Sequence, residues 1–364
     1  MYNLLSLLFY SYCVLLSLGC TQLIAQKKAQ AKKYKIIGFK DAITISERQD
    51  ILEHHGLKVK KHLPIAKACL CEVQSSEANL QSLAVNDEVE FIEDDYTARI
   101  QVMPVETAAF KIFAQDIPWG IKKIGASKVW GEAKGEGIKV GIIDTGIDRN
   151  HPDLKDNIKE VCGTMNCKNI DDDNGHGTHV AGTIAAVDNR IGVIGVAPKA
   201  QIYSIKAFDA KGRGQVSDII DGLNWCVEQK VHVINMSFGF NMRSNALKRA
   251  IRQVHEHNIV MVAAAGNSGG DNTVLYPAKY PEVIAVAASD VKDKAASFSS
   301  SGPEVNIIAP GVDILSTHIG QSYKQLSGTS MACPHVAGAI AILISSGKIS
   351  GNNIKDIIFD SAQD

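Results

Sequence analysis

The sequence predicts an α/β fold with a three-layer parallel sheet, preceded by a small α+β unit. Two observations predict the larger part. From Gly137 onward, apolar and β-branched runs of buried-strand length recur: KVGIIDTG, QIYSIKAF, VHVINMSF, IVMVAAAGN and VIAVAAS. Between them lie stretches with helical periodicity, VSDIIDGLNWCVEQK and NALKRAIRQVHEHN. Strands that alternate with helices are typical of a parallel sheet covered by helices on both faces.

The smaller unit spans Lys33 to Ile100. Its predicted strands are KYKIIGF, KACLCEV and EVEFIEDD, and its predicted helices are SERQDILEHHG and SSEANLQSLAVND. The stretch from Tyr96 to Ala114 has no strong pattern, and we interpret residues 101–114 as a linker. A second domain then spans residues 115–364.

The bulk composition is that of a globular protein of about two domains. The chain has 364 residues, is 45% hydrophobic and carries a formal net charge of -1. No concentration of basic charge marks a nucleic-acid footprint, so we expect no nucleic-acid partner.

The first segment, residues 1–25, has the pattern of a cleaved export signal, although no Lys or Arg precedes its apolar run. Cleavage after Ala25 would release a soluble extracellular protein. The sequence Ser17-Leu18-Gly19-Cys20 also resembles a loose lipoprotein box, in which Cys20 would be lipidated at the cell envelope. A membrane anchor is a third interpretation, but the apolar run is at the short end for a span of about 20 residues.

Export bears on the cysteines. Cys162 and Cys167 lie close together in the glycine-containing stretch VCGTMNCKN. In an exported protein they could form a local disulfide; otherwise they are free thiols.

Polar, turn-forming groups follow three of the predicted strands, where the site of a parallel sheet gathers. These groups are Asp144-Thr145-Gly146, Ser237-Phe238-Gly239 and Gly266-Asn267-Ser268. A carboxylate at the end of a buried strand, such as that of Asp144, needs a partner. Taken singly, Asp144 could be a turn or capping residue and Asn267 a left-handed turn residue.

Two further motifs add reactive side chains. NGHGTHVAG holds His176 and His179, and LSGTSMACPHVAG places Ser330 at the start of an apolar helix. Backbone N–H groups at such a helix start favour developing negative charge. A plain N-cap serine is the alternative. Zinc would need a third ligand and HExxH-type spacing, which these two histidines lack.

The order Asp, His, Ser and the motifs DTGID, NGHGTHVAG, AAAGNSG and GTSMACPHVAG resemble the subtilisin-like serine proteases over roughly Gln115 to Ala362. The resemblance implies that Ser330 is the nucleophile and His176 its base, oriented by Asp144. The amide of Asn267 and the backbone N–H of Ser330 would bind the oxyanion. His179 would be structural.

The resemblance also implies where substrate binds. A peptide would add as a strand between two edges, one formed by Gly212, Arg213 and Gly214 and the other by Ser237, Phe238 and Gly239. Val216, Ile219 and Phe238 would line an apolar subsite. Leu275 stands where several relatives keep a smaller residue at the bottom of the main specificity pocket, so that pocket should disfavour large aromatics.

A calcium site is implied by the stretch from Val187 to Val193, which resembles the family's calcium loop. Oxygen atoms from several residues would form the shell that a hard cation prefers. These residues are Gln115, Asp153, Val187, Asn189, Ile191 and Val193. The alternative is a loop that folds without metal.

Residues 33–100 resemble the inhibitor-type propeptide of these proteases, including the closing FIEDDY. Such a segment would help the catalytic domain fold and block its cleft until it is cut away. The linker is longer than in many relatives, so the sequence does not identify the scissile bond. Relatives continue beyond DSAQD through a strand and a final helix, so the C-terminus is short by comparison.

These features together predict an exported, monomeric serine endopeptidase that acts on proteins or peptides and is made as a self-processing zymogen. A catalytically silent binding protein on the same fold is one alternative, and the intact Asp144, His176, Asn267 and Ser330 argue against it. A dedicated processing protease or a non-peptidase hydrolase is another. No acidic ring is evident around the cleft, which disfavours cleavage at dibasic sites.

Overall fold

The computed structural model describes residues 34–73, 77–104, 108–164, 170–347 and 357. The predicted export signal, Cys167 of the predicted disulfide and the end of the chain lie outside these residues. The described part divides into two compact units. Residues 34–62 and 67–95 belong to the first, and residues 63–66 with the chain from Tyr96 onward belong to the second.

The first unit has the α+β composition that the sequence predicts. Its four strands are β1 (Tyr34–Phe39), β2 (Leu57–Leu63), β3 (Ala68–Val73) and β4 (Val89–Asp94), in the order β2-β3-β1-β4. Its helices are α2 (Ile45–His54) and α3 (Glu77–Ala84). Thr44 and Glu47 form a capping box that starts α2. Apolar side chains from both helices and the sheet form its core, among them Phe39, Leu52, Cys69, Cys71 and Leu83.

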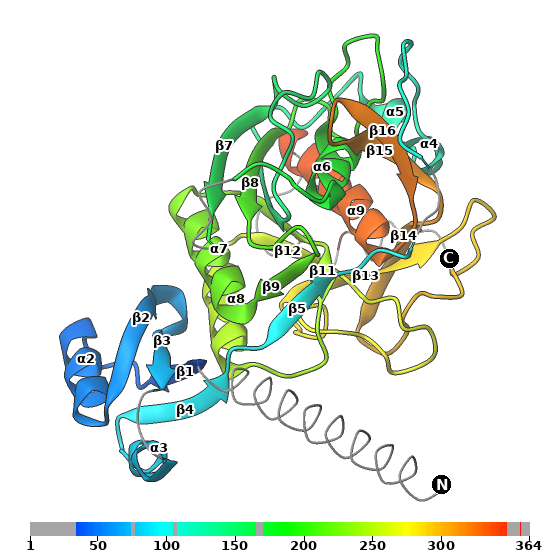
Figure 1. Cartoon of the computed structure of the whole chain (residues 1–364). Helices are drawn as coiled ribbons and strands as arrows, with labels where there is room; N and C mark the ends of the chain where they lie inside the picture. The colour runs from blue at the N-terminus through cyan, green and yellow to red at the C-terminus, as the bar shows by residue number, and fades with distance from the viewer. Residues whose placement is uncertain (1–33, 74–76, 105–107, 165–169, 348–356, 358–364) are drawn as a thin grey trace, which may run out of the picture. The chain divides into compact units, whose positions relative to one another are not determined.

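A seven-stranded parallel sheet organises the second unit, which confirms the predicted fold class (Figure 1). Its order is β14-β13-β12-β10-β6-β8-β7. The strands are β6 (Lys139–Asp144), β7 (Ile158–Gly163), β8 (Gln201–Lys206), β10 (Val233–Met236), β12 (Val260–Ala264), β13 (Val283–Ser289) and β14 (Val305–Pro310).

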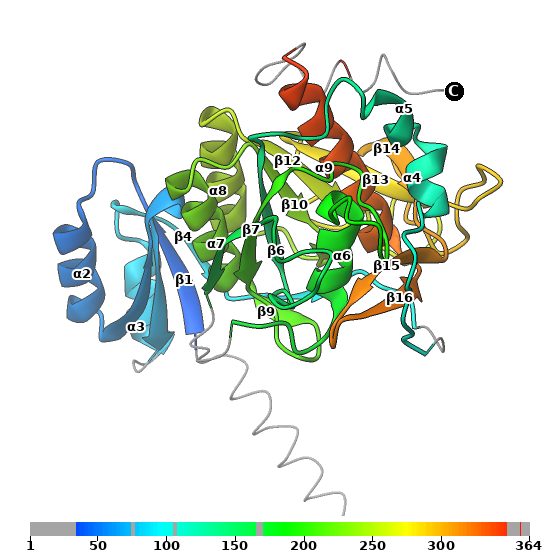
Figure 2. The same cartoon turned by 90° about the horizontal axis from the view of Figure 1, so that it is seen from above.

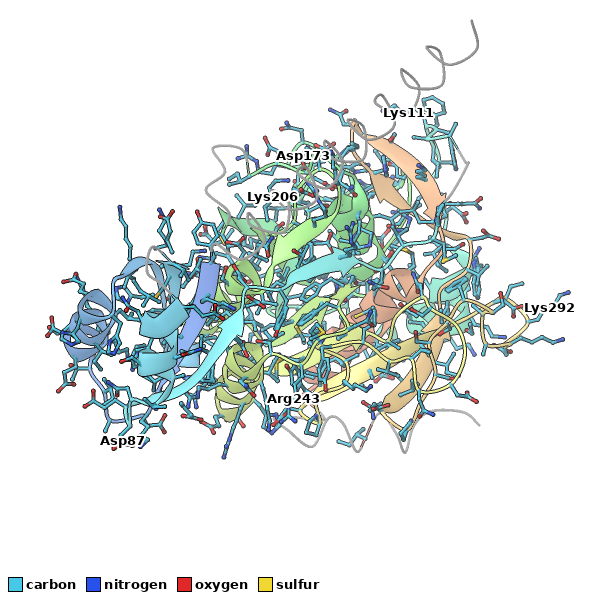
Figure 3. All side chains as sticks on the ribbon, turned by 60° about the horizontal axis from the view of Figure 1, so that its bottom comes forward. Asp87, Lys111, Asp173, Lys206, Arg243 and Lys292 are labelled. Atoms are coloured by element: carbon cyan, nitrogen blue, oxygen red, sulfur yellow. The ribbon has the colours of Figure 1, made fainter. Side chains whose placement is uncertain are left out.

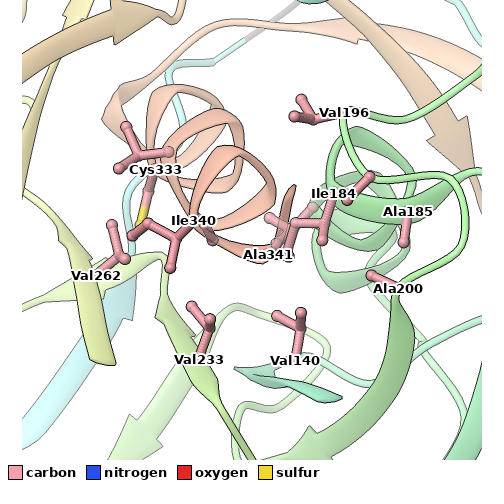
Figure 4. Packing of buried hydrophobic residues seen from close by; sticks show 14 of the residues in the cluster. Val140, Ile184, Ala185, Val196, Ala200, Val233, Val262, Cys333, Ile340 and Ala341 are labelled. Atoms are coloured by element: carbon pink, nitrogen blue, oxygen red, sulfur yellow. The ribbon is translucent and has the colours of Figure 1, made fainter. Parts of the chain in front are cut away.

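Helices cover both faces of this sheet. Figure 2 shows α7 (Val216–Glu228) and α8 (Asn245–Glu256) on one side, and α6 (His176–Ala185) and α9 (Thr329–Ser345) on the other. α9 is apolar on nearly its whole circumference and is buried between α6 and the sheet. Small side chains such as Ala341 let it lie close to Ile184 of α6 and to Val140 and Val233 of the strands (Figure 4).

The remaining elements of the second unit are short. α4 (Trp119–Lys123), α5 (Ala126–Val129) and the 3-10 turn Pro64–Ala66 are helical, and β15 (Ile314–His318) pairs with β16 (Ser322–Leu326) in a hairpin. No helix of the described residues is long and apolar enough to cross a membrane.

A further three-stranded sheet has the order β11-β5-β9 and lies outside the main one. Its strands are β5 (Thr97–Ile100), β9 (Arg213–Gln215) and β11 (Phe238–Gly239). The sequence assigns Tyr96 to Ile100 to the α+β unit. In the structure these residues form part of the second unit, because the hydrogen-bond partners of β5 are β9 and β11.

Candidate active site

Three neighbouring strands carry polar groups at one edge of the main sheet. β6 ends at Asp144, β10 leads into Ser237, and β12 leads through Gly266 into Asn267. β10 lies between β6 and β12, and all three run parallel. The sheet therefore brings together the groups that the sequence selects from separate motifs.

Asp144 and His176 form a buried pair. His176 Nδ1 donates to Asp144 Oδ1 over 2.7 Å, and both side chains are about 1% exposed. The same oxygen accepts from the backbone N–H of Thr145 at 2.8 Å. A proton held on Nδ1 leaves Nε2 of the neutral ring as an acceptor. Within the described residues that Nε2 is buried and has no hydrogen-bond partner.

Asp172, which is not among the predicted site residues, holds the end of β6 against the first turn of α6. Its Oδ1 accepts from Thr145 Oγ1 and Gly175 N, each at 2.8 Å. Its Oδ2 accepts from Thr178 N at 2.9 Å and Thr178 Oγ1 at 2.7 Å. Thr145 Oγ1 in turn accepts a hydrogen bond from the backbone N–H of Gly177 at 2.9 Å. This network fixes the spacing between Asp144 and His176.

A sequence signal for Asp172 does exist. The N-cap of α6 is Gly175, whose φ of 100° suits glycine and which has no side chain to cap the helix. The free N–H groups of the first turn therefore need an acceptor from elsewhere. Asp172 lies three residues before the cap and supplies it.

Lys206 places a buried positive charge beside this loop. It ends β8, directly opposite Asp144 in the parallel register, and is 2% exposed. Its Nζ donates to Thr145 O at 2.7 Å and to Asp173 Oδ1 at 2.6 Å (Figure 3). A buried ammonium requires such partners, so Lys206 restrains the strand end and the loop before His176 together.

His179 lies one turn further along α6 and is fully buried. Its Nε2 contacts the carbonyl oxygens of Ile314 and Lys324 at 2.9 and 3.0 Å. Burial, with a smaller contribution from His176, lowers the pKa of His179 to about 3. The ring stays neutral and ties α6 to the hairpin of β15 and β16.

Ser330 is the second residue of α9 and is fully buried. Pro334 has no N–H to donate to the carbonyl four residues earlier, which is that of Ser330. Ser237 Oγ donates to this carbonyl instead, at 3.1 Å. Ser330 Oγ donates to the carbonyl of Ser237 at 2.7 Å and has no hydrogen bond to His176.

Asn267 faces the same helix start. Its Oδ1 accepts from the backbone N–H of Thr329 at 2.9 Å and from Thr329 Oγ1 at 2.8 Å. These two bonds fix the amide plane and turn Nδ2 the other way. Nδ2 is buried and finds no partner in the described part of the chain. A buried unpaired donor is costly, which makes this amide a ready donor to a carbonyl oxygen.

The chain's own residues 97–103 pass through this site as an extended peptide. β5 pairs antiparallel with β9 and with β11, between the two edges predicted to bind substrate. Ile100 N donates to Gly212 O at 3.1 Å, and Gln101 N donates to Ser237 O at 3.2 Å. Beyond Ser330, Met103 N donates to Ser327 O at 2.8 Å.

The carbonyl of Gln101 lies at the start of α9. Ser330 N donates to Gln101 O at 3.2 Å, and Gln101 N lies 3.0 Å from Ser330 Oγ. A Cβ on Gly328 would come within 2.5 Å of Gln101 O and 3.1 Å of Asn267 Nδ2. The absence of a side chain at Gly328, whose φ is 154°, therefore lets the peptide approach both donors.

The predicted subsite residues are buried. Val216, Ile219 and Phe238 are fully buried, as is Ala98 on the inward face of β5. Leu275 packs against two glycines at the strand ends, because a Cβ on Gly239 or Gly266 would lie within 2.9 Å of its side chain.

All six residues predicted to bind calcium make hydrogen bonds within the set. Gln115 Nε2 donates to Val187 O at 2.9 Å, and Asn189 Nδ2 donates to Asp153 Oδ1 at 3.0 Å. The other two residues are on the same loop: Val193 N donates to Asp153 Oδ2 at 2.9 Å, and Ile191 N donates to Asn189 Oδ1 at 3.1 Å.

This set fits calcium in its chemistry. Asp153 supplies a fully buried carboxylate, and Val187 supplies a backbone carbonyl. Rotation of the two side-chain amides about their terminal bonds would turn their oxygens inward in place of their nitrogens. The described residues contain no cluster of three or more His, Cys, Asp or Glu side chains suited to a metal. A site with one carboxylate relies on neutral oxygens, which calcium accepts.

Comparison with known proteins identifies the family. The model of the subtilase family matches residues 135–364. The chain belongs to the subtilase family. It is 39% identical to Subtilisin E of Bacillus subtilis (strain 168) over 350 residues, which cover 93% of this chain and 87% of that protein.

Two other relatives agree with this assignment. Subtilisin DY of Bacillus licheniformis is 49% identical over 240 residues, covering 64% of this subtilase and 86% of the relative. The Alkaline protease of Alkalihalobacillus alcalophilus is 36% identical over 345 residues, covering 92% and 87%. This subtilase is therefore a serine-type endopeptidase, and the alternative of a silent binding protein is not retained.

We predict that Asp172→Ala lowers kcat about 100-fold, the cost expected when catalytic groups shift by about 1 Å. KM should change little, because Asp172 does not contact β9 or β11. The measurement is kcat per titrated active site. Asp171→Ala removes a neighbouring carboxylate that is 47% exposed, and should leave kcat unchanged. A lower Tm with unchanged kcat for Asp172→Ala would mean that Asp172 only stabilises the fold.

Proposed function

We propose that this subtilase is an exported endopeptidase made as a zymogen, and that it cuts its own chain between Gln101 and Val102. The observation that supports this bond is the position of the Gln101 carbonyl. It accepts from Ser330 N at 3.2 Å, and Ser330 Oγ lies 3.0 Å from the nitrogen of the same residue.

In this proposal Ser330 Oγ attacks the carbonyl carbon of Gln101. A hydroxyl is a weak nucleophile, so Oγ first turns from the Ser237 carbonyl to His176 Nε2, which takes its proton. Asp144 holds the Nδ1 proton and stabilises the charged ring. His176 then gives the proton to the Val102 nitrogen as the peptide bond breaks, and water hydrolyses the acyl-enzyme.

The oxyanion formed on Gln101 would have two donors. One is Ser330 N, which already donates to this oxygen, and the other is Asn267 Nδ2, which has no other partner in the described chain. Both are fixed before reaction, one by α9 and the other by Thr329. Donors that need no reorganisation contribute most to the stabilisation of developing charge.

The N-terminal segment would act as the intramolecular inhibitor. β5 occupies both edges that a substrate strand would need, so no other peptide can bind there while it stays. The similarity to Subtilisin E covers 93% of the chain and so extends into this segment. The apolar run of residues 1–25 supports export. The exported protein would be either cleaved after Ala25 or lipidated at Cys20.

Leu275 would set the main substrate preference. Its side chain lies against Gly239 and Gly266, which flank the predicted pocket for the residue before the scissile bond. The Gln101 side chain does not need a deep pocket, because its Nε2 donates back to Arg99 O at 3.0 Å. We expect small residues to be preferred at this position.

Calcium would be held by Asp153, by the amide oxygens of Gln115 and Asn189 and by the carbonyls of Val187, Ile191 and Val193. When bound it would join the segment at Gln115 to the loop after α6, with no part in the reaction. A bound calcium ion would also offset the negative charge of the buried Asp153 carboxylate.

Self-processing is tested by Ser330→Ala, which removes the nucleophile and changes the volume of the helix start very little. This variant should accumulate as a full-length precursor, whereas the wild type should yield a chain that begins at Val102. Mass spectrometry and N-terminal sequencing over time measure both. Ser346→Ala, at the other end of α9, should mature normally. Maturation of Ser330→Ala at the wild-type rate would show that another protease makes the cut.

The role of Leu275 is tested with a peptide library. The wild type should cleave after Ala in preference to Phe, and Leu275→Gly should raise kcat/KM for Phe relative to Ala by about 10- to 200-fold. Val274→Ala, next to it in the chain and equally buried, should keep the wild-type profile. Equal cleavage after Phe and Ala by the wild type would exclude a shortened pocket, and strict dibasic cleavage would favour a processing protease.

Calcium should raise the Tm of the matured protein, because it binds only the folded state. At a calcium concentration of 100 times its Kd, the free energy of unfolding should rise by about 2.7 kcal/mol. Asp153→Asn should abolish the difference between the Tm measured with chelator and the Tm measured with added calcium. Asp188→Asn should keep that difference, since its carboxylate is 50% exposed and pairs with Lys134. A wild-type Tm that is the same with chelator and with calcium would exclude the site.

A further inference from the structure

Phe110 and Lys111, which follow Val102 in the chain, are held on the hairpin of β15 and β16. Phe110 and Tyr323 form an antiparallel bridge, in which Phe110 N donates to Tyr323 O at 3.0 Å and Tyr323 N donates to Phe110 O at 2.8 Å. Lys111 Nζ donates to the carbonyls of Gly320 and Gln321 in the hairpin turn (Figure 3). These bonds lie beyond the scissile bond, on the side that the leaving group takes.

Ile112 adds an apolar anchor. It is half-buried and packs against a small cluster formed by Ala186, Val193 and Tyr323. Tyr323 is itself rigid, since its hydroxyl donates to Asp153 at 2.9 Å and its ring meets that of His151 edge to face. Phe113, the next residue but one to Lys111, is 87% exposed and takes no part in this cluster.

The same stretch of chain is also fixed at its far end. Gln115 N donates to Arg190 O at 3.1 Å, and Asp116 N donates to Gly192 O at 2.7 Å. The segment is thus attached to the enzyme independently of the Gln101–Val102 bond. Cutting that bond breaks none of these contacts, so the new N-terminus would remain tethered to the enzyme.

We propose that the new N-terminal arm, of which residues 102–104 and 108–114 are described, stays attached after the cut, with residues 110–112 on the hairpin and Met103 on the leaving-group side of the cleft. This inference rests on the proposed cut between Gln101 and Val102. The hydrogen bond from Met103 N to Ser327 O is the one that the second residue after the scissile bond of a substrate would need. A tethered occupant has a high effective concentration there, so it competes with substrates from solution.

The arm therefore confers a specific selectivity. The edges formed by β9 and β11 become free once β5 leaves, while the Ser327 carbonyl stays occupied. Substrates that end shortly after the scissile bond should be cleaved normally. Peptides that continue for several residues beyond it should be cleaved more slowly until the arm is displaced.

The test compares two substrates with the same residues before the scissile bond. One is a p-nitroanilide, and the other continues for four residues beyond the cut. Self-matured wild type, Ile112→Asp and Phe113→Asp are assayed, after mass spectrometry has verified that each begins at Val102. Ile112→Asp should raise the ratio of kcat/KM for the long substrate to that for the short one about tenfold, the factor expected for losing one partly buried isoleucine. Phe113→Asp should leave the ratio unchanged.

The short substrate reports that each variant is folded and active. If Ile112→Asp fails to mature, Ile112→Ala replaces it, with a smaller rise in the same ratio expected. An unchanged ratio for the Ile112 variant, or an equal rise for Phe113→Asp, would overturn the inference while leaving the protease function intact. A matured chain that begins after Ile112 would also overturn it. Failure to hydrolyse either substrate would overturn the proposed function as well.

Discussion

The burial of one carboxylate governs the site. Asp144 ends β6 at full burial, and an ionised group there needs compensation. Its Oδ1 accepts hydrogen bonds from His176 Nδ1 and from the backbone N–H of Thr145, while Oδ2 has no hydrogen-bond partner among the described residues. The arrangement holds only if α6 begins at a fixed distance from β6. Asp172 and Lys206 bond to Thr145 and to the loop before α6, so they maintain that distance.

The part of the site around Ser330 depends on two missing groups: Pro334 has no backbone N–H, and Gly328 has no side chain. Pro334 cannot donate to the Ser330 carbonyl, which is therefore open to Ser237 Oγ, and this links α9 to the end of β10. Gly328 has no side chain where Gln101 O passes at the helix start. Neither residue reacts, yet together they fix the serine and admit a peptide carbonyl beside it. The helix N-terminus then supplies its free N–H groups.

Sequence patterns predict the interior of the sheet better than its margins. β6, β8, β10, β12 and β13 are buried on both faces and read as apolar runs, but the edge strands β7 and β14 do not, because much of their surface meets solvent. β5 is missed for another reason, since its partners β9 and β11 are far away in sequence. The side chains at the strand ends could be selected from motifs, whereas the role of Asp172 depends on contacts that only the folded loop creates.

The peptide in the cleft is held mainly by its backbone. Ala98 is the one fully buried side chain of β5, and it is small. Arg99 stands opposite Arg213 in the antiparallel register, a like-charge pair that Asp209 only partly offsets by its own bond to Arg213. Any extended peptide can make the same backbone bonds. If the chain is cut after Gln101 as proposed, β5 would be held mainly by backbone hydrogen bonds that a substrate peptide can also form, so this strand alone would inhibit weakly.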